Sequence, residues 1–256
     1  MRLNKFLASC GVAARRKCDT LIFEGHVTVN GELVTEPARQ VAESDKVCLD
    51  GQSVCQTRLV YLVMNKPVGV LSAVEDSRER TVVDILPEEY DDLRLFPVGR
   101  LDKESEGLII LTNDGEFANE ISHPSNGIVK TYEVELWRPL TEEKLAEWRE
   151  GVTYEGVFMK PVSVERIEGR RPRGSHVEVK LVQGLKREIR FMARALDYHV
   201  KALVRRQIGD LSLGNLASGE VREFTREEIE KAIKKTQDSR LKTQGEECLR
   251  HGLKNN

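Results

Sequence analysis

A charged loop between two short apolar runs constrains the fold of this chain more than any other stretch. Residues 95–98 and 108–111 are mainly apolar, and the loop between them is framed by Gly99 and Gly107. Because both runs are short and bounded by Gly, Pro or Asn, the pattern predicts two strands. Glycine allows positive φ, so such a loop can present a side chain to a ligand. Its charge pattern alone favours a solvated hairpin loop, since surface loops are usually polar.

The size and composition of the chain fit a globular protein. With 256 residues, of which 32% are charged and 39% hydrophobic, it can form one large or two modest domains with a buried core. Its five cysteines are scattered and have no zinc-binding spacing, which favours a reducing, cytoplasmic location and predicts no metal site. No apolar stretch approaches the roughly 20 residues needed to span a membrane.

Charge is distributed unevenly along the chain, although the net charge is only -2. The first 20 residues carry a single acid and a set of five bases, which are Arg2, Lys5, Arg15, Arg16 and Lys17. Residues 75–92 carry eight acids and two bases. A chain with this polarity can bind phosphate through its basic end while it stays near neutral overall.

Residues 1–59 are predicted to form a small separate domain. Apolar residues recur at helical spacing over residues 3–10, and a second helix is expected over residues 13–24. Residues 27–34 contain an Asn-Gly pair between alternating apolar positions, which indicates a β-hairpin. Residues 45–49 predict one more strand. The region is therefore expected to contain two helices followed by short strands.

The chain that follows is predicted to alternate between strands and helices. Short or alternating apolar segments predict strands over residues 60–64, 129–136, 157–167, 176–182 and 199–208. Helical spacing, capping residues and a stopping proline predict helices over residues 81–87, 117–121, 141–150, 186–196 and 225–235. Residues 236–256 are polar and aperiodic, so they are predicted to be a disordered tail.

The charged loop resembles a known family motif. Residues 99–108, with the sequence Gly-Arg-Leu-Asp-Lys-Glu-Ser-Glu-Gly-Leu, resemble the signature Gly-Arg-Leu-Asp-x-x-Ser/Thr-x-Gly-Leu of the RNA pseudouridine synthases. The resemblance is to the RsuA-like branch, which acts on ribosomal RNA. In that family the aspartate is the catalytic residue, so the resemblance places this role on Asp102. Arg100, in the same motif, becomes a candidate for substrate binding.

Three further segments resemble motifs of the same family. Asn-Lys-Pro-x-Gly matches the first motif, and its Lys66 is expected either to contact RNA or to support the catalytic loop. Lys-x-Tyr matches the second motif and puts the stacking of the target base on Tyr132, although a strand tyrosine is more often simply packed in a sheet. Residues 186–196 match the third motif, whose Arg or Lys pairs with the catalytic aspartate, here Arg190.

Two residues depart from the third motif. Phe191 stands where the family usually has a second Arg, which leaves open any contact that this arginine normally makes. Asp197 stands where Gly commonly ends the helix. Since Asp tolerates the left-handed conformation better than most residues, the fold is expected to survive this change.

The N-terminal region resembles the small RNA-binding domain first described in ribosomal protein S-four. The matching segments are Arg-Leu-x-Lys-x-Leu-Ala, Gly-Val-Ala-x-Arg-Arg-Lys and Gly-x-Val-x-Val-Asn-Gly. A basic triplet taken alone is more often only solvated. The resemblance, however, implies RNA binding through Arg2, Lys5, Arg15, Arg16 and Lys17. Contacts of this kind to the RNA backbone position a protein without specifying sequence.

The resemblance implies an isomerase that breaks the glycosidic bond of a uridine, rotates the uracil and rejoins it through a ring carbon. This reaction needs no redox change and no energy source, so no cofactor is expected. In agreement, the sequence contains no Gly-rich nucleotide loop. One carboxylate, Asp102, would act as a nucleophile or as a general base. Arg190 would hold this carboxylate ionised and aimed.

The sequence therefore predicts an α+β protein of three regions. A helix-hairpin RNA-binding domain over residues 1–59 precedes a catalytic domain over residues 60–235, built on a mixed, mainly antiparallel sheet with flanking helices. Residues 236–256 form the tail. The expected partner is structured RNA, foremost ribosomal RNA, bound by a cytoplasmic monomer without a nucleotide cofactor or membrane contact. Three alternatives stay open: the same reaction on transfer RNA, a non-catalytic ribosome-assembly factor, and a protein-interaction pair without RNA affinity.

Overall fold

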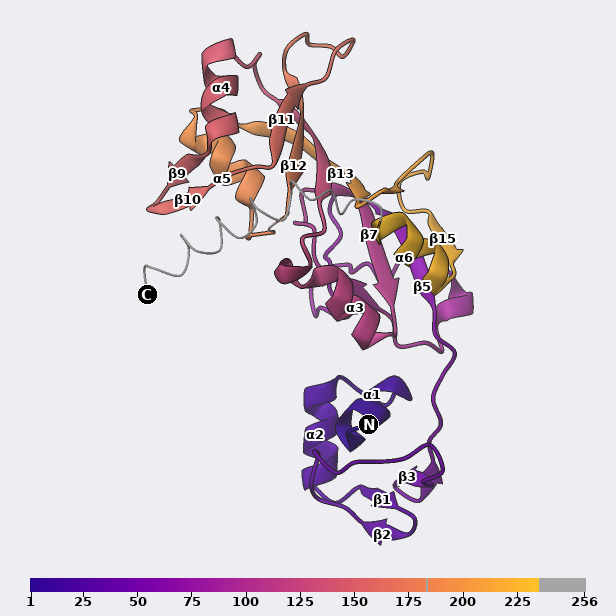
Figure 1. The fold of residues 1–256 in the computed structure, drawn as a ribbon. Helices are drawn as coiled ribbons and strands as arrows, with labels where there is room; N and C mark the ends of the chain where they lie inside the picture. The colour runs from indigo at the N-terminus through magenta and orange to yellow at the C-terminus, as the bar shows by residue number, and fades with distance from the viewer. Residues whose placement is uncertain (183, 235–256) are drawn as a thin grey trace.

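The computed structural model describes residues 1–182 and 184–234, and it begins with a small helix-and-hairpin part (Figure 1). Two short helices are followed by a four-stranded sheet of order β2-β1-β3-β4. These elements are α1 (Leu3–Ser9), α2 (Arg15–Phe23), β1 (Val27–Val29), β2 (Glu32–Leu33), β3 (Val47–Leu49) and β4 (Gln52–Ser53). The predicted order of two helices and then strands is confirmed.

The N-terminal part has its own hydrophobic core. Leu3 and Leu7 of α1 and Ile22 of α2 are fully buried together with Val27 of β1. The remaining residues of this core all lie before residue 55. The hairpin turn has positive φ at Asn30 and Gly31, as the Asn-Gly pair predicts. The residues expected to bind RNA are thus presented by a unit that packs around its own apolar side chains.

The rest of the described chain is built on a nine-stranded sheet. Seven strands follow the order β11-β12-β8-β13-β7-β5-β15, with β14 paired to β13 and β6 paired to β7. The strands are β5 (Tyr61–Lys66), β6 (Phe96–Val98), β7 (Glu106–Thr112), β8 (Lys130–Leu136), β11 (Ser163–Arg166), β12 (His176–Leu181), β13 (Val200–Ile208), β14 (Leu211–Ser212) and β15 (Val221–Phe224). Only β7 and β13 pair in parallel among the described strands. The predicted mixed, mainly antiparallel sheet is therefore confirmed.

One half of this sheet is buried on both faces. Figure 1 shows α3 (Gly115–Ser122) and α6 (Arg226–Lys234) beside β7 and β5. On that face Val63 and Ile110 pack with helix residues, whereas Leu62 and Ile109 pack on the opposite face against residues 70–95. Strands covered on both sides are apolar throughout rather than alternating. This double burial makes β5 and β7 a rigid frame for the loop that precedes β7.

The other half of the sheet packs against α4 (Glu142–Glu150) and α5 (Glu188–Ala195). Figure 1 shows both helices at the end of the molecule remote from α1 and α2. Val134 of β8 lies in one core with Trp148 of α4 and Met192 of α5. A two-stranded sheet of β9 (Val152–Tyr154) and β10 (Val157–Met159) packs beside α5. This packing brings α5 up to the sheet next to β13.

Two predicted elements are wrong. Residues 81–87 form no helix: Thr81 and Asp84 exchange hydrogen bonds of 2.8 and 3.3 Å in a turn, and a 3-10 helix, Glu88–Tyr90, follows Pro87. The capping pair is present, but Pro87 lies only three residues after Asp84 and ends the segment before a helix can form. The predicted strand 157–167 is two strands, β10 and β11, because Pro161 between them cannot donate a ladder hydrogen bond.

The ends of the other predicted helices agree with their capping signals. Thr225 and Glu228 exchange hydrogen bonds at the start of α6, as a capping box predicts. Asp197 has a φ of 66°, so it takes the left-handed conformation expected after α5. Strands β4, β9, β14 and β15 are additions that the sequence patterns did not predict. The predicted tail, residues 236–256, lies outside the described residues.

Candidate active site

The loop between β6 and β7 carries Asp102, which lines a cavity of about 250 Å³. Asp102 is half-buried, and the loop begins and ends at glycines with positive φ, Gly99 at 72° and Gly107 at 115°. A neighbouring segment holds the loop in place, because the Gly69 N–H donates to the Lys103 carbonyl at 2.8 Å. The solvated-hairpin alternative therefore does not describe this loop, since it packs on the protein and opens into a cavity.

The cavity joins the loop to β8, β12, β13 and the start of α5. Tyr132 of β8 is 7% exposed and lines the cavity together with Asp102. Leu181, Leu203 and Ile189 supply apolar wall from three other elements. Residues 184–188 complete the wall before and within the first turn of α5. An aromatic ring, aliphatic side chains and one half-buried carboxylate thus share a single small space.

Lys66 lies beneath the loop and has no exposed surface. Its ammonium donates to the Ser105 carbonyl at 2.9 Å and to the Pro67 carbonyl at 2.8 Å. Burial lowers the pKa of Lys66 to about 8, and the charges of Asp102 and Glu104 oppose that shift. With no exposed surface, the Lys66 ammonium is not presented to RNA here, so this geometry does not favour the expected substrate contact. The alternative, support of the catalytic loop, is the one that this geometry fits.

Arg190 of α5 reaches the same loop by a different route. Its Nη2 donates to the Glu104 carbonyl at 3.1 Å and lies 3.5 Å from the Ser105 hydroxyl. Among the described residues no ion pair within 4.0 Å joins Arg190 to Asp102. Burial lowers the pKa of Arg190, and the charge of Asp102 opposes that shift. Arg187 adds an ion pair of 2.9 Å to Glu104. The first turn of α5 is therefore tied to the loop two to three residues beyond Asp102.

Comparison with known proteins identifies the family. A family model described as RNA pseudouridylate synthase matches residues 60–195, and one described as S4 domain matches residues 1–53. An RNA pseudouridine synthase of Bacillus subtilis named YtzG is 37% identical over 235 residues, covering 90% of this chain and 97% of the relative. The chain belongs to the RNA pseudouridine synthase family.

Two other relatives and one solved structure agree with this assignment. The ribosomal large subunit pseudouridine synthase B of Bacillus subtilis is 36% identical to this chain, and the match covers 90% of this chain and 94% of the relative. The dual-specificity RNA pseudouridine synthase RluF of Escherichia coli is 37% identical, over 90% of this chain and 77% of its own. A crystal structure of a pseudouridylate synthase superposes with a TM-score of 0.65 at 29% identity, covering 91% of this chain and all of that one.

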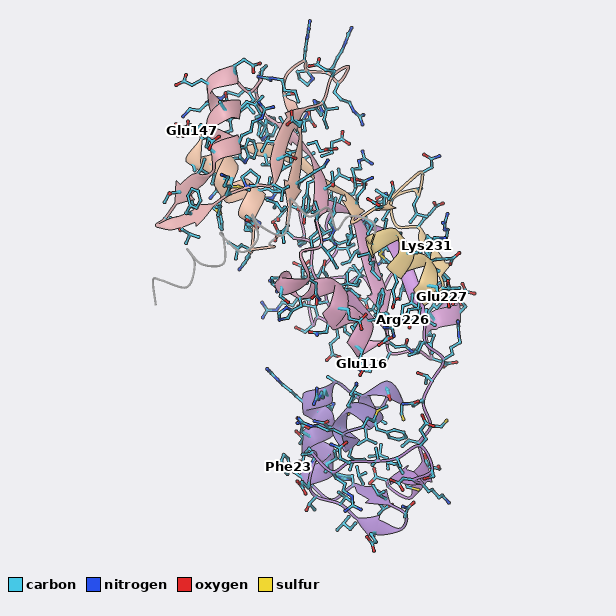
Figure 2. The ribbon with its side chains drawn as sticks, viewed as in Figure 1. Phe23, Glu116, Glu147, Arg226, Glu227 and Lys231 are labelled. Carbon is cyan, nitrogen blue, oxygen red and sulfur yellow. The ribbon has the colours of Figure 1, made fainter. Side chains whose placement is uncertain are left out.

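The basic residues of the N-terminal part are differently placed. Arg2, Arg15, Arg16 and Lys17 are exposed, and the last three form the first turn of α2. Lys5 of α1 instead forms an ion pair with Glu116 of α3. Figure 2 shows Glu116 at the end of α3 that faces α1 and α2. Four of the five residues predicted to contact RNA are therefore exposed, and the fifth, Lys5, is engaged by a carboxylate of the same chain.

Three charged residues near the cavity were missed by the sequence analysis, and two of them, Arg205 and Glu188, are buried. Arg205 of β13 is 2% exposed, Glu188 lines the cavity, and Lys130 begins β8. Burial raises the pKa of Glu188 to about 6 and lowers that of Lys130 to about 8. Hydrophobic periodicity could not identify them, because a charged residue within an apolar pattern is normally assigned to the exposed face of its strand or helix. The Lys-x-Tyr motif does include Lys130, but only the tyrosine was singled out.

Residues 1–182 and 184–234 contain neither a cluster of metal-binding side chains nor a helix that could span a membrane. Within these ranges no three or more His, Cys, Asp or Glu side chains are grouped as a metal site would require. No helix there has both the length and the apolar composition needed to cross a membrane. The four cysteines in the same ranges, Cys10, Cys18, Cys48 and Cys55, are unpaired.

Proposed function

We propose that the synthase converts a uridine of ribosomal RNA to pseudouridine, with Asp102 as the catalytic carboxylate. One observation carries the proposal: Asp102 and Tyr132, which the family motifs single out, line the same cavity from different elements. The volume of about 250 Å³ lies just below the roughly 300–1,000 Å³ of pockets for drug-sized ligands, which suits one extruded nucleotide base. Extrusion costs a few kcal/mol of lost stacking, and a tyrosine face can recover part of it.

The residues around the cavity divide the work of the reaction. The carboxylate of Asp102 is placed against the flipped nucleotide, as a nucleophile or as a general base. Tyr132 holds the detached uracil while it rotates, and the aliphatic wall of Leu181 and Leu203 keeps water from competing for the broken bond. Lys66 and Arg190 hold the loop from below and from the side. Every step rearranges bonds within one nucleotide, so no external donor of electrons or groups is consumed.

Ribosomal RNA is the proposed substrate because a curated relative of nearly equal length is named for the large ribosomal subunit. The exposed bases Arg15, Arg16 and Lys17 support binding to the phosphates of a folded RNA. Arg100 is exposed at the loop and is proposed to contact the substrate next to the target uridine. We also propose a cytoplasmic monomer, and the unpaired cysteines among the described residues suit a reducing compartment.

The substrate is tested by mapping pseudouridine in all cellular RNA with and without the gene. Loss of one or a few ribosomal sites is the expected result. Loss of pseudouridine only from transfer RNA would show that transfer RNA is the substrate and would leave the proposed reaction unchanged. Loss at no site, together with retained RNA binding, would contradict the proposal in favour of a non-catalytic binding factor.

The catalytic role is tested with Asp102→Asn, which keeps the size of the side chain and removes its charge and basicity. Activity is expected to fall below detection while RNA affinity is kept, because the carboxylate participates in the chemistry and not in holding the RNA. Asp92→Asn is the matched control, since Asp92 is exposed in the turn before β6. Pseudouridine formation by the Asp102 variant within about threefold of wild type, less than 0.7 kcal/mol in barrier, would contradict the assignment.

A further inference from the structure

Arg205 is the most deeply buried arginine beside the catalytic loop. It lies in β13, directly opposite Gly107 in the parallel pairing with β7, and is 2% exposed. Its Nε donates to the Leu108 carbonyl at 2.7 Å, and its Nη1 lies 3.5 Å from the Arg100 carbonyl. Leu108 follows the loop and Arg100 precedes Asp102. One guanidinium therefore contacts the chain on both sides of the catalytic residue.

Stability alone does not account for this arginine. Arginine is almost never fully buried unless it is paired. Among the described residues no carboxylate lies within 4.0 Å of Arg205, whose hydrogen-bond acceptors are main-chain carbonyls. Desolvation chiefly lowers the pKa values of two neighbouring lysines, Lys66 and Lys130, and the charge of Arg205 lowers both further, so Arg205 repels each of them. An apolar side chain at this position would avoid both costs.

We propose that Arg205 is a positioning residue, which fixes the loop so that Asp102 meets the flipped uridine in a reactive geometry. The proposal rests on the catalytic role proposed above for Asp102. The planar guanidinium suits the task because it presents several donors in a rigid fork, whereas a lysine offers a flexible point charge. Lys66 holds the Ser105 carbonyl between the two Arg205 contacts, so the loop is secured before, within and after its turn.

The close approach of β7 and β13 explains why the fork can reach both carbonyls. A Cβ atom built on Gly107 would lie 2.6 Å from the main-chain nitrogen of Arg205, closer than real Cβ atoms come. The two backbones therefore touch where the loop ends, and the Arg205 side chain passes directly beneath it. A reacting group displaced by about 1 Å can lose on the order of 100-fold in rate, so small movements of this loop are expected to matter.

The experiment compares Arg205→Gln, Arg205→Lys and the matched control Arg206→Gln. Arg206 is the next residue of β13 and pairs with Glu133 at 2.8 Å, away from the loop. The single-turnover rate of pseudouridine formation and the Kd for RNA are measured for each variant. Arg205→Gln is expected to lose about 100-fold in rate at an unchanged Kd. Arg205→Lys is expected to lose less, and Arg206→Gln to match wild type.

A second readout does not depend on activity or on the identity of the substrate. Hydrogen exchange of the amides of residues 101–106 is expected to become faster in both Arg205 variants, with the rest of β7 unchanged. If Arg205→Gln does not fold, the lysine variant decides both measurements. Rates and exchange equal to wild type in the lysine variant, or a loss expressed only as weaker RNA binding, would overturn the proposal.

The outcomes also separate this proposal from the one on which it rests. Asp102→Asn is expected to remove activity and leave the exchange of the loop unchanged. If Asp102→Asn is active but the Arg205 variants still free the loop, the catalytic assignment fails and the structural role of Arg205 stands. If Asp102→Asn is inactive and the Arg205 variants behave as wild type, only the positioning role fails.

Discussion

Glu188 is a buried carboxylate whose protonation links the cavity wall to pH. It is 5% exposed, and its Oε2 accepts a hydrogen bond of 3.0 Å from the Leu185 N–H. Burial raises its pKa from 4.5 to about 6, while this hydrogen bond and the charge of Lys130 act in the opposite direction. Between pH 4.5 and 6 the folded protein therefore keeps a proton that the unfolded chain releases. Folding stability accordingly falls as pH rises through this window.

Replacing Glu188 with Gln is expected to remove that part of the pH dependence. The free energy of unfolding of wild type should fall between pH 4.5 and 6 by up to about 2 kcal/mol more than that of the variant, the equivalent of moving a pKa from 4.5 to about 6. Urea unfolding at half-unit steps of pH measures the difference. Glu178→Gln, on β12 and partly exposed, is the control. Parallel curves for wild type and Glu188→Gln would contradict the expectation.

At the scale of elements, the junction of β7 and β13 leaves no room for a side chain at Gly107. Gly107 combines a φ of 115° with the main-chain contact to Arg205, whereas Gly99 has a φ of 72° and open space around its missing Cβ. Both glycines frame the same loop. They differ in that only Gly107 lies where two strands come too close for a side chain.

Gly107→Ala is therefore expected to destabilise the protein by at least about 3 kcal/mol, from backbone strain and the clash with β13 together. Gly99→Ala is expected to cost only about 1–2 kcal/mol, from positive φ alone. Thermal or urea unfolding of both variants gives the comparison. Equal losses would show that the conformation of the glycines, and not the approach of the two strands, sets the cost.

Much of this architecture follows from local signals, and the rest depends on contacts that are remote in the sequence. The Asn-Gly turn, the capping box at Thr225 and the left-handed Asp197 were all predicted, because each depends on neighbouring residues. Strand β15 was not, since its partner β5 lies far back in the chain. Phe191, which replaces a family arginine, stacks on Tyr154 with ring centroids 5.2 Å apart. This contact packs β9 against α5, and the motif gave no indication of it.

The candidate site divides in the same way. The motifs located Asp102, Tyr132 and Arg190, and the cavity brings the first two together. They also located Lys66 but could not tell whether it would face RNA or the protein, because burial is a property of the assembled sheet. Arg205 lies in a strand without a matching motif, and its role depends on a loop that precedes it by about 100 residues.

At the scale of the whole molecule, the ion pair of Lys5 and Glu116 links the RNA-binding part to the catalytic part. Both side chains are partly exposed, Glu116 by 65%, so the pair is expected to add at most about 1 kcal/mol to stability. Lys5 is also a proposed phosphate contact. RNA phosphate and the Glu116 carboxylate therefore compete for one ammonium, and bound RNA would release the link between the two parts.

Glu116→Gln is expected to lower the melting temperature by at most about 4 °C and to strengthen RNA binding at low salt, because Lys5 no longer has to leave a carboxylate. Lys5→Gln is expected to weaken binding and to reduce the slope of log K against log salt by about 1. Titrations of RNA at several salt concentrations measure both effects. Glu32→Gln, in the exposed strand β2, controls for the change in net charge. Equal strengthening of RNA binding by Glu116→Gln and Glu32→Gln would contradict a specific competition between Glu116 and RNA phosphate for Lys5.

The parallel pairing of β7 with β13 also determines the order in which the protein becomes functional during its synthesis. The N-terminal core is complete once residue 54 has left the ribosome, so its basic helix is available early. The Leu108 carbonyl can accept its hydrogen bond only after Arg205, 97 residues further along the chain, has been synthesised. A nascent or truncated chain is therefore expected to hold RNA before it can modify it. Pairings so distant in sequence also fold slowly, which widens the interval between the two events.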